Sequence, residues 1–181
     1  MRGIKWDISA GAVLLFALMY YFDDSGLFAV MTPAIVIHEM GHFLMLCVFG
    51  RRLRRVRVGL YGIEMDYAPG MEGGKEVLCA AAGPLFGALY AIAACTCGGE
   101  FFTRSGAASF LLTVFNLLPV LPLDGGHIVS ALLPKRAARA ISIITSVLYF
   151  SFCVWLLATY HAAAPLLIAA WLVFCNLKNG A

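Results

Sequence analysis

The stretch "AVMTPAIVIHEMGHFLMLCVFG", Ala29 to Gly50, decides how this chain folds and where its chemistry lies. It is apolar over a length that can cross a bilayer, since about 20 apolar residues in an α-helix span the hydrocarbon layer. Yet it contains two histidines and a glutamate, namely His38, His42 and Glu39. Ionisable groups inside a membrane are costly, so these three side chains are candidates for function.

The composition of the whole chain indicates a membrane protein. Of its 181 residues, 62% are hydrophobic and 13% are charged, whereas soluble domains are closer to half apolar and a quarter charged. Because backbone groups in lipid must bond within their own segment, each apolar run predicts a helix. We therefore predict an all-α polytopic membrane protein with about six transmembrane helices, forming a single domain over residues 1–181. The apolar runs lie at about 4–22, 27–49, 77–97, 106–133, 140–160 and 162–177.

The placement of basic residues predicts the orientation. The first run is expected to be a retained helix, because no small-x-small cleavage site follows it. With the N-terminus in the cytoplasm, all but Arg104 of the 13 Lys and Arg residues lie on the cytoplasmic side. The positive-inside rule thus predicts a multi-pass protein of the cell membrane with both termini cytoplasmic. The net charge of +3 follows from this asymmetry and gives no reason to expect nucleic acid.

The motif "HEMGH" points to a metal site. Residues four apart share one face of a helix, so His38 and His42 could bind one ion together. Glu39 would lie beside that ion, where it could act as the base for a bound water. The alternative is a set of buried groups bonded to neighbouring helices. We favour the metal site, because three ionisable groups at this spacing in hydrocarbon would otherwise be a costly coincidence.

A third ligand is expected from "FNLLPVLPLDGGHI", Phe115 to Ile128. A catalytic zinc usually takes three protein ligands and a water, and Asp124 is the only carboxylate in any other apolar run. Counting at ~1.5 Å per residue, the histidines and Asp124 all lie roughly 12–18 Å from the cytoplasmic ends of their runs. Two prolines and two glycines predict a break over residues 119–126, which is tolerated at membrane depth where backbone lines a cavity.

Three further features have two interpretations each. Asn116 could bond a substrate backbone or the oxyanion formed during attack, or it could serve packing between helices. His127 could orient Asp124 or a substrate carbonyl, and is less favoured as a metal ligand. Alternating apolar residues between 56 and 67 predict a short cytoplasmic β-hairpin around Gly62. The edge of that hairpin could pair with an unwound substrate, or the hairpin could have no substrate contact.

Taken together, these residues resemble the site-2 protease family of zinc intramembrane metalloproteases. "VIHEMGH" matches the first motif of the family, and "LPLDGGH" resembles its Leu-Asp-Gly motif. "AAGPLFGALY", Ala81 to Tyr90, resembles the Ala-Gly-Pro element of the helix between them. The resemblance covers about Thr32 to Leu133 and is greatest to the bacterial branch that contains the stage IV sporulation protease, which processes a pro-sigma factor.

The resemblance implies a zinc-dependent metalloendopeptidase with one zinc ion per chain. Its ligands would be His38, His42 and Asp124, and Glu39 would be the catalytic base. A three-helix core over about 27–133 would be flanked by the first helix and the last two. The implied reaction is hydrolysis of a peptide bond near the cytoplasmic side of a membrane-spanning or membrane-associated protein. The bilayer is the second implied partner, while a regulatory membrane partner and the oligomeric state stay open.

Two other classes of function are weighed against this one. A divalent-metal transporter would need further ligands along a path to the other face, and the outer halves of the apolar runs lack ionisable groups. An inactive metal-binding scaffold is disfavoured only because Glu39 is intact. Haem binding is weaker still, because two histidines one turn apart on one helix cannot reach opposite faces of a porphyrin.

Overall fold

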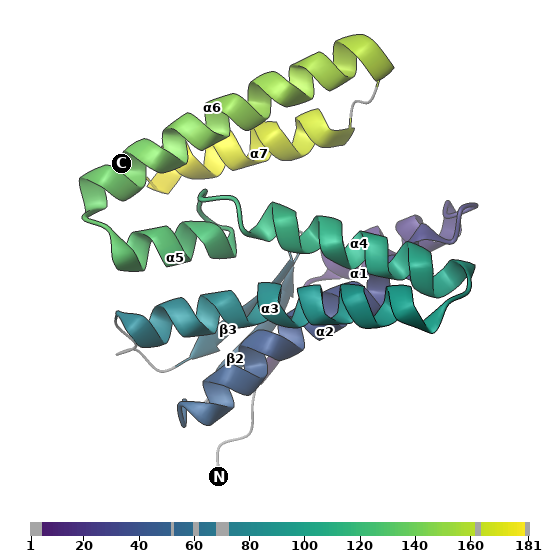
Figure 1. Ribbon diagram of the computed structural model, residues 1–181, viewed down its shortest axis with the longest axis horizontal. Helices are drawn as coiled ribbons and strands as arrows, with labels where there is room; N and C mark the ends of the chain where they lie inside the picture. The colour runs from purple at the N-terminus through teal and green to yellow at the C-terminus, as the bar shows by residue number, and fades with distance from the viewer. Residues whose placement is uncertain (1–4, 52, 60–61, 68–72, 162–163, 180–181) are drawn as a thin grey trace. The chain divides into compact units, whose positions relative to one another are not determined.

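The computed structural model describes residues 5–51, 53–59, 62–67, 73–161 and 164–179. This part of the chain forms seven helices and three strands (Figure 1). Contacts group the chain into two compact units. The first comprises Met1–Met71 and Ala82–Thr113, and the second comprises Glu72–Ala81 and Val114–Ala181.

The first unit contains a small sheet. Strand β2, Leu53–Gly59, pairs antiparallel with β3, Gly62–Tyr67, and the end of the hairpin is set by the pairing of Gly59 with Gly62. The predicted hairpin is therefore confirmed, although its side of the membrane stays a prediction. On its other edge β2 pairs in parallel with β1, Lys5–Ile8.

Strand β1 corrects two predictions. Residues 5–8 were expected inside a helix over 4–22, and the β-structure of the otherwise helical fold was expected to be a hairpin without a third strand. Helix α1 instead begins at Ala10, where the side chain of Ser9 accepts a hydrogen bond from the N–H of Ala12 at 3.1 Å. The backbone N–H of Ser9 bonds the carbonyl of Val58 on β2 at 3.0 Å. The strand ends at Ile8, and Ser9 caps the start of α1, because its side chain accepts a bond from a first-turn N–H that lacks an intrahelical partner.

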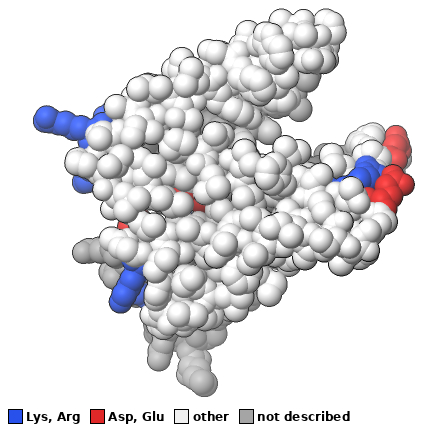
Figure 2. All heavy atoms as spheres, viewed as in Figure 1, with Lys and Arg blue, Asp and Glu red and all other residues white. Residues whose placement is uncertain are grey.

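Three of the described helices are long and apolar enough to span a membrane, namely α2, Leu27–Val48, α3, Gly74–Cys97, and α6, Lys135–Tyr160. Helix α1, Ala10–Tyr21, has 12 residues, and at ~1.5 Å per residue it is shorter than the hydrocarbon layer. Six spans are therefore not confirmed. Most of the surface visible in Figure 2 carries neither acidic nor basic side chains, as expected of a protein that faces lipid.

Buried hydroxyl groups join the helices of the first unit. Helix α4, Glu100–Asn116, places Ser105 and Ser109 at zero exposure. The Ser105 hydroxyl donates to the carbonyl of Val30 on α2, and that of Ser109 donates to the carbonyl of Gly87 on α3, each at 2.8 Å. Between apolar helices such bonds satisfy polar groups that lipid cannot.

The second unit confirms the broken fourth run. Helix α4 ends at Asn116, and α5, Asp124–Leu132, follows after a non-helical segment. Helices α6 and α7, Ala164–Asn179, complete the unit. The core of this unit includes side chains of the loop 117–123. Its buried members are Val120, Leu123 and Leu172, and Phe115, Leu118, Tyr149 and Trp171 pack against them.

The break lies two to three residues earlier than predicted, over 117–123. It was expected over 119–126, whereas residues 124–126 are helical. A Cβ on Gly125 would overlap the backbone carbonyl of Leu117, and one on Gly126 would lie 2.5 Å from the backbone nitrogen of Leu121. These glycines therefore permit close approach of the loop and do not end a helix.

Candidate metal centre

The two histidines of α2 lie together as the motif predicted. Their Nε2 atoms are 3.3 Å apart, and His38 is only 4% exposed. Two nitrogens at ~2.0–2.1 Å from a tetrahedral zinc ion are separated by about 3.3 Å. The pair therefore matches one edge of a zinc coordination tetrahedron. Glu39, the next residue after His38, is partly buried and lies about 100° further around the helix.

The imidazoles are held by close packing of α2 against α3. A Cβ on Gly83 would overlap the imidazole of His42, and a Cβ on Gly87 would lie 3.7 Å from Nδ1 of His38. Gly41 of α2 lies equally close to the carbonyl of Ala82, since a Cβ there would be 2.5 Å from that oxygen. The two histidines are four positions apart in the sequence, and so are the two glycines that face them. Each imidazole thus lies against a position of α3 that carries no side chain.

Sequence reasoning missed these positioning glycines. The stretch "AAGPLFGALY" was noted only for its resemblance to a family element, and no contact was assigned to it. The two glycines in this predicted helix were themselves a signal. Each costs a helix interior about 1 kcal/mol relative to alanine, so their presence suggests a close contact that excludes a side chain. Thr113 was also missed. It is 6% exposed, and a Cβ on Gly87 would lie 2.5 Å from its Oγ1.

The other predicted site residues lie in the second unit. Asp124 is the first residue of α5 and is partly buried, while Asn116 is the last residue of α4 and is also partly buried. The loop between them is not helical, so the two residues lie on different helices. His127 is exposed on α5, and its backbone N–H donates to the carbonyl of Leu123 at 3.2 Å.

Sequence comparison relates the chain to known proteases. Residues 99–158 match Peptidase family M50. The chain is 28% identical over 152 residues to Stage IV sporulation protein FB of Bacillus subtilis (strain 168), covering 77% of this chain and 52% of that protein. It is 29% identical over 121 residues to Zinc metalloprotease MJ0392 of Methanocaldococcus jannaschii, covering 61% of this chain and 35% of that protein. The chain thus spans about half the length of one curated relative and about a third of the other.

Comparison with solved structures also finds a protease of related fold. The fold matches the Site-2 Protease from Methanocaldococcus jannaschii with a TM-score of 0.67 at 20% identity, covering 98% of this chain and 91% of that chain. The predicted resemblance to the site-2 proteases is confirmed. One of these relatives is named as a zinc metalloprotease, and three described helices of the present chain are long and apolar enough to span a membrane.

Proposed function

We propose that this chain is a zinc-dependent intramembrane endopeptidase. It hydrolyses a peptide bond near the cytoplasmic side of a membrane-spanning or membrane-associated protein. One observation carries the proposal: on α2, two imidazole Nε2 atoms lie 3.3 Å apart beside a glutamate. Helix α2 is a candidate membrane span of 22 residues. Ionisable side chains are costly at such a position, so this cluster is expected to have a function.

Each proposed residue has a distinct role. His38, His42 and Asp124 would hold one zinc ion, which supplies an activated water and polarises the scissile carbonyl. A carboxylate oxygen of Glu39 accepts the proton of the attacking water and later returns it to the leaving amine nitrogen. The side-chain amide of Asn116 donates a hydrogen bond to the developing oxyanion. In this proposal His127 orients a substrate carbonyl.

Substrate binding would use the small sheet of the first unit. A substrate helix hides its carbonyls, so it must unwind before attack, and an unwound segment can add to a free strand edge. With β2 between the other two described strands, β1 and β3 offer the edges. We expect deletion of residues 59–67 to lower cleavage of a membrane-spanning substrate without removing zinc. Unchanged cleavage would exclude this role for the hairpin.

The central experiment compares Glu39→Gln with wild type. Protein purified in detergent is given a membrane-spanning test substrate, cleavage is followed by gel electrophoresis, and zinc is measured by elemental mass spectrometry. We expect Glu39→Gln to keep its zinc and to lose about a thousandfold in cleavage rate, within the range for loss of a general base. The matched control is Glu100→Gln, since Glu100 is 87% exposed and pairs only with Arg104 at 3.8 Å within the described residues.

The same protein distinguishes the competing functions. Asp124→Asn should hold zinc less well, as expected when a ligand is lost. Normal cleavage by Glu39→Gln would refute the assigned base. Wild-type protein that carries divalent metal across vesicle membranes would favour a transporter, and wild type that binds zinc yet cleaves none of a panel of membrane-spanning substrates would favour a scaffold.

A further inference from the structure

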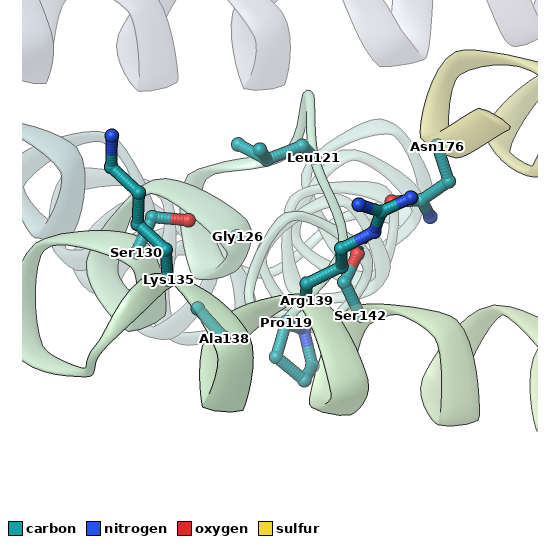
Figure 3. Close-up of a pocket in the computed structure, with 9 residues that line it drawn as sticks. All are labelled: Pro119, Leu121, Gly126, Ser130, Lys135, Ala138, Arg139, Ser142 and Asn176. Atoms are coloured by element: carbon teal, nitrogen blue, oxygen red, sulfur yellow. Dashed lines mark hydrogen bonds between the residues drawn. The ribbon is translucent and has the colours of Figure 1, made fainter. Parts of the chain in front are cut away.

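A cavity with both polar and apolar lining residues lies in the second unit, formed by the loop 117–123 with α5, α6 and α7. Its volume is about 320 Å³, at the small end of the range for ligand pockets. Nine residues line it, and two are cations from the first turns of α6, Lys135 and Arg139 (Figure 3). None of the lining residues is acidic.

The two cations lie one turn apart on the same helix. Like charges at this spacing repel each other. Among the described residues, no carboxylate forms an ion pair with Lys135 or with Arg139. In Figure 3 both side chains extend from α6 in the same direction, Lys135 beside Ser130 and Arg139 beside Asn176. A bound anion would relieve the repulsion between the two cations.

Neutral groups in the cavity add hydrogen-bond donors. Ser142 donates to Oδ1 of Asn176 at 2.7 Å, and Nδ2 of Asn176 donates to Ser146 at 2.6 Å. The Ser146 hydroxyl uses its own hydrogen on the carbonyl of Ser142 at 2.7 Å, so it can only accept from Asn176. This fixes the orientation of the amide, and the amide nitrogen keeps a second hydrogen for a ligand.

From this donor set we propose that the cavity binds a phosphate group, supplied by the headgroup of an anionic phospholipid. Arginine matches phosphate oxygens with two parallel N–H bonds, and lysine adds a compact charge. Basic pockets between membrane helices bind such headgroups. Exposed apolar side chains lie on either side of the two cations, where acyl chains would pack. They include Leu132, Leu133, Ile143 and Ile144 at 63%, 39%, 48% and 59% exposure.

The cavity lies next to the loop that precedes Asp124, so a phosphate bound there would affect this loop. Pro119 and Leu121 of the loop and Gly126 of α5 also line it. Pro119 and Leu121 lie five and three residues before Asp124 in the sequence, and Gly126 lies two residues after it. A phosphate held by α6 and Asn176 would therefore brace the loop that positions this carboxylate. This consequence for activity depends on the proposed function, whereas phosphate binding does not.

Binding is tested by native mass spectrometry of the purified full chain in uncharged detergent. The probe is phosphatidylglycerol, with phosphatidylcholine as the zwitterionic comparison. At about 1 kcal/mol per cation, Lys135→Gln/Arg139→Gln should weaken phosphatidylglycerol binding about thirtyfold. Both side chains are exposed, so the fold should persist, and thermal unfolding in phosphatidylcholine checks this. The matched control is Arg136→Gln, since Arg136 lies between them in sequence but does not line the cavity; it should bind within about threefold of wild type.

Three results would overturn the proposal. Wild type that prefers phosphatidylglycerol no more than phosphatidylcholine would exclude an anionic lipid. If Arg136→Gln weakened phosphatidylglycerol binding as much as the double variant does, the binding would come from general surface charge and not from this cavity. Binding of soluble glycerol phosphate, seen as a shift in mass, without a preference for phosphatidylglycerol over phosphatidylcholine would show that the cavity binds phosphate but not a lipid headgroup. As a second readout, phosphatidylglycerol should raise the cleavage rate of wild type more than that of the double variant. If the chain has no protease activity, the binding measurement still tests the proposed phosphate site.

Discussion

The "HEMGH" segment of α2 and the "DGGH" segment of α5 both depend on glycine, but in different ways. Beside the histidines, the glycines belong to the neighbouring helix α3, and Gly83 leaves room for the ring of His42. Beside Asp124, the glycines follow it in the same segment and let the loop 117–123 lie on the start of α5. The imidazoles are therefore placed by two regular helices, whereas the carboxylate lies where a non-helical loop meets the start of α5. The first arrangement is set by helix geometry, and the second depends on how the loop packs on α5.

The largest effect is expected from Gly83→Ala, which tests the packing around the histidines. Its Cβ would overlap the imidazole of His42, and the two Nε2 atoms would lose the separation of 3.3 Å. Changes beside metal ligands commonly cost 10–100-fold in affinity or activity. We expect zinc affinity and cleavage rate each to fall by about a hundredfold, measured by zinc titration against a chelator and by the gel assay.

The matched control for this substitution is Gly74→Ala. Gly74 is also on α3, and a Cβ there would meet nothing within 4 Å. It should leave zinc affinity and cleavage rate unchanged, and helix propensity makes it neutral to slightly stabilising. If Gly83→Ala retained wild-type zinc affinity, the histidine pair would not depend on the packing of α3.

The comparison also explains what could be predicted from the sequence. The histidine pair followed from spacing on a helix, because a period of 3.6 residues places His38 and His42 on one face. The hairpin followed from alternation around Gly62. Contacts between distant segments could not be obtained this way, since nothing in the order of residues states that Gly83 faces His42. For the same reason β1 was missed, because its partner β2 lies more than 40 residues further along the chain.

Gly125→Ala tests the loop around Asp124 and should have a smaller effect. Its Cβ would overlap the carbonyl of Leu117, which is backbone and cannot turn aside as a side chain can. Overpacking of this kind typically costs 1–3 kcal/mol of stability. We expect the apparent Tm in detergent to fall. Cleavage should drop about tenfold, because a displaced Asp124 would cost about 1.4 kcal/mol of transition-state stabilisation.

Comparing the two glycine variants sharpens the contrast between the regions. Gly125→Ala should lower Tm in the presence and in the absence of a zinc chelator, since the loop is strained in either case. Gly83→Ala should lower Tm mainly in the presence of zinc, because its chief effect is on the histidine pair that we propose binds the ion. Equal Tm losses from Gly125→Ala and Gly74→Ala would show that the loop does not need this close approach.

The smallest effect is expected at the start of α2, from Asp23→Asn. The Asp23 carboxylate accepts bonds from the N–H groups of Leu27 at 2.8 Å and Phe28 at 2.6 Å. Desolvation acts to raise the pKa of Asp23, but the hydrogen bonds from Phe28, Leu27 and Ser25 outweigh it and hold this pKa below its ordinary value. A lowered pKa in the folded state means that the carboxylate stabilises the fold above its unfolded pKa. This contribution is lost as the pH falls through the folded pKa.

Thermal unfolding at a series of acidic pH values measures this contribution. At neutral pH Asp23→Asn should lower Tm slightly and leave cleavage unchanged, because the start of α2 at Leu27 lies about three turns before His38. On acidification the Tm difference between wild type and Asp23→Asn should close. Asp24→Asn is the matched control, since Asp24 is exposed, and its Tm should follow wild type throughout. Acid also releases zinc by protonating histidine ligands, but it does so in all three proteins alike, so the difference between them isolates the carboxylate. A gap that persists at low pH would show that the Asp23 side chain acts through packing and not through its charge.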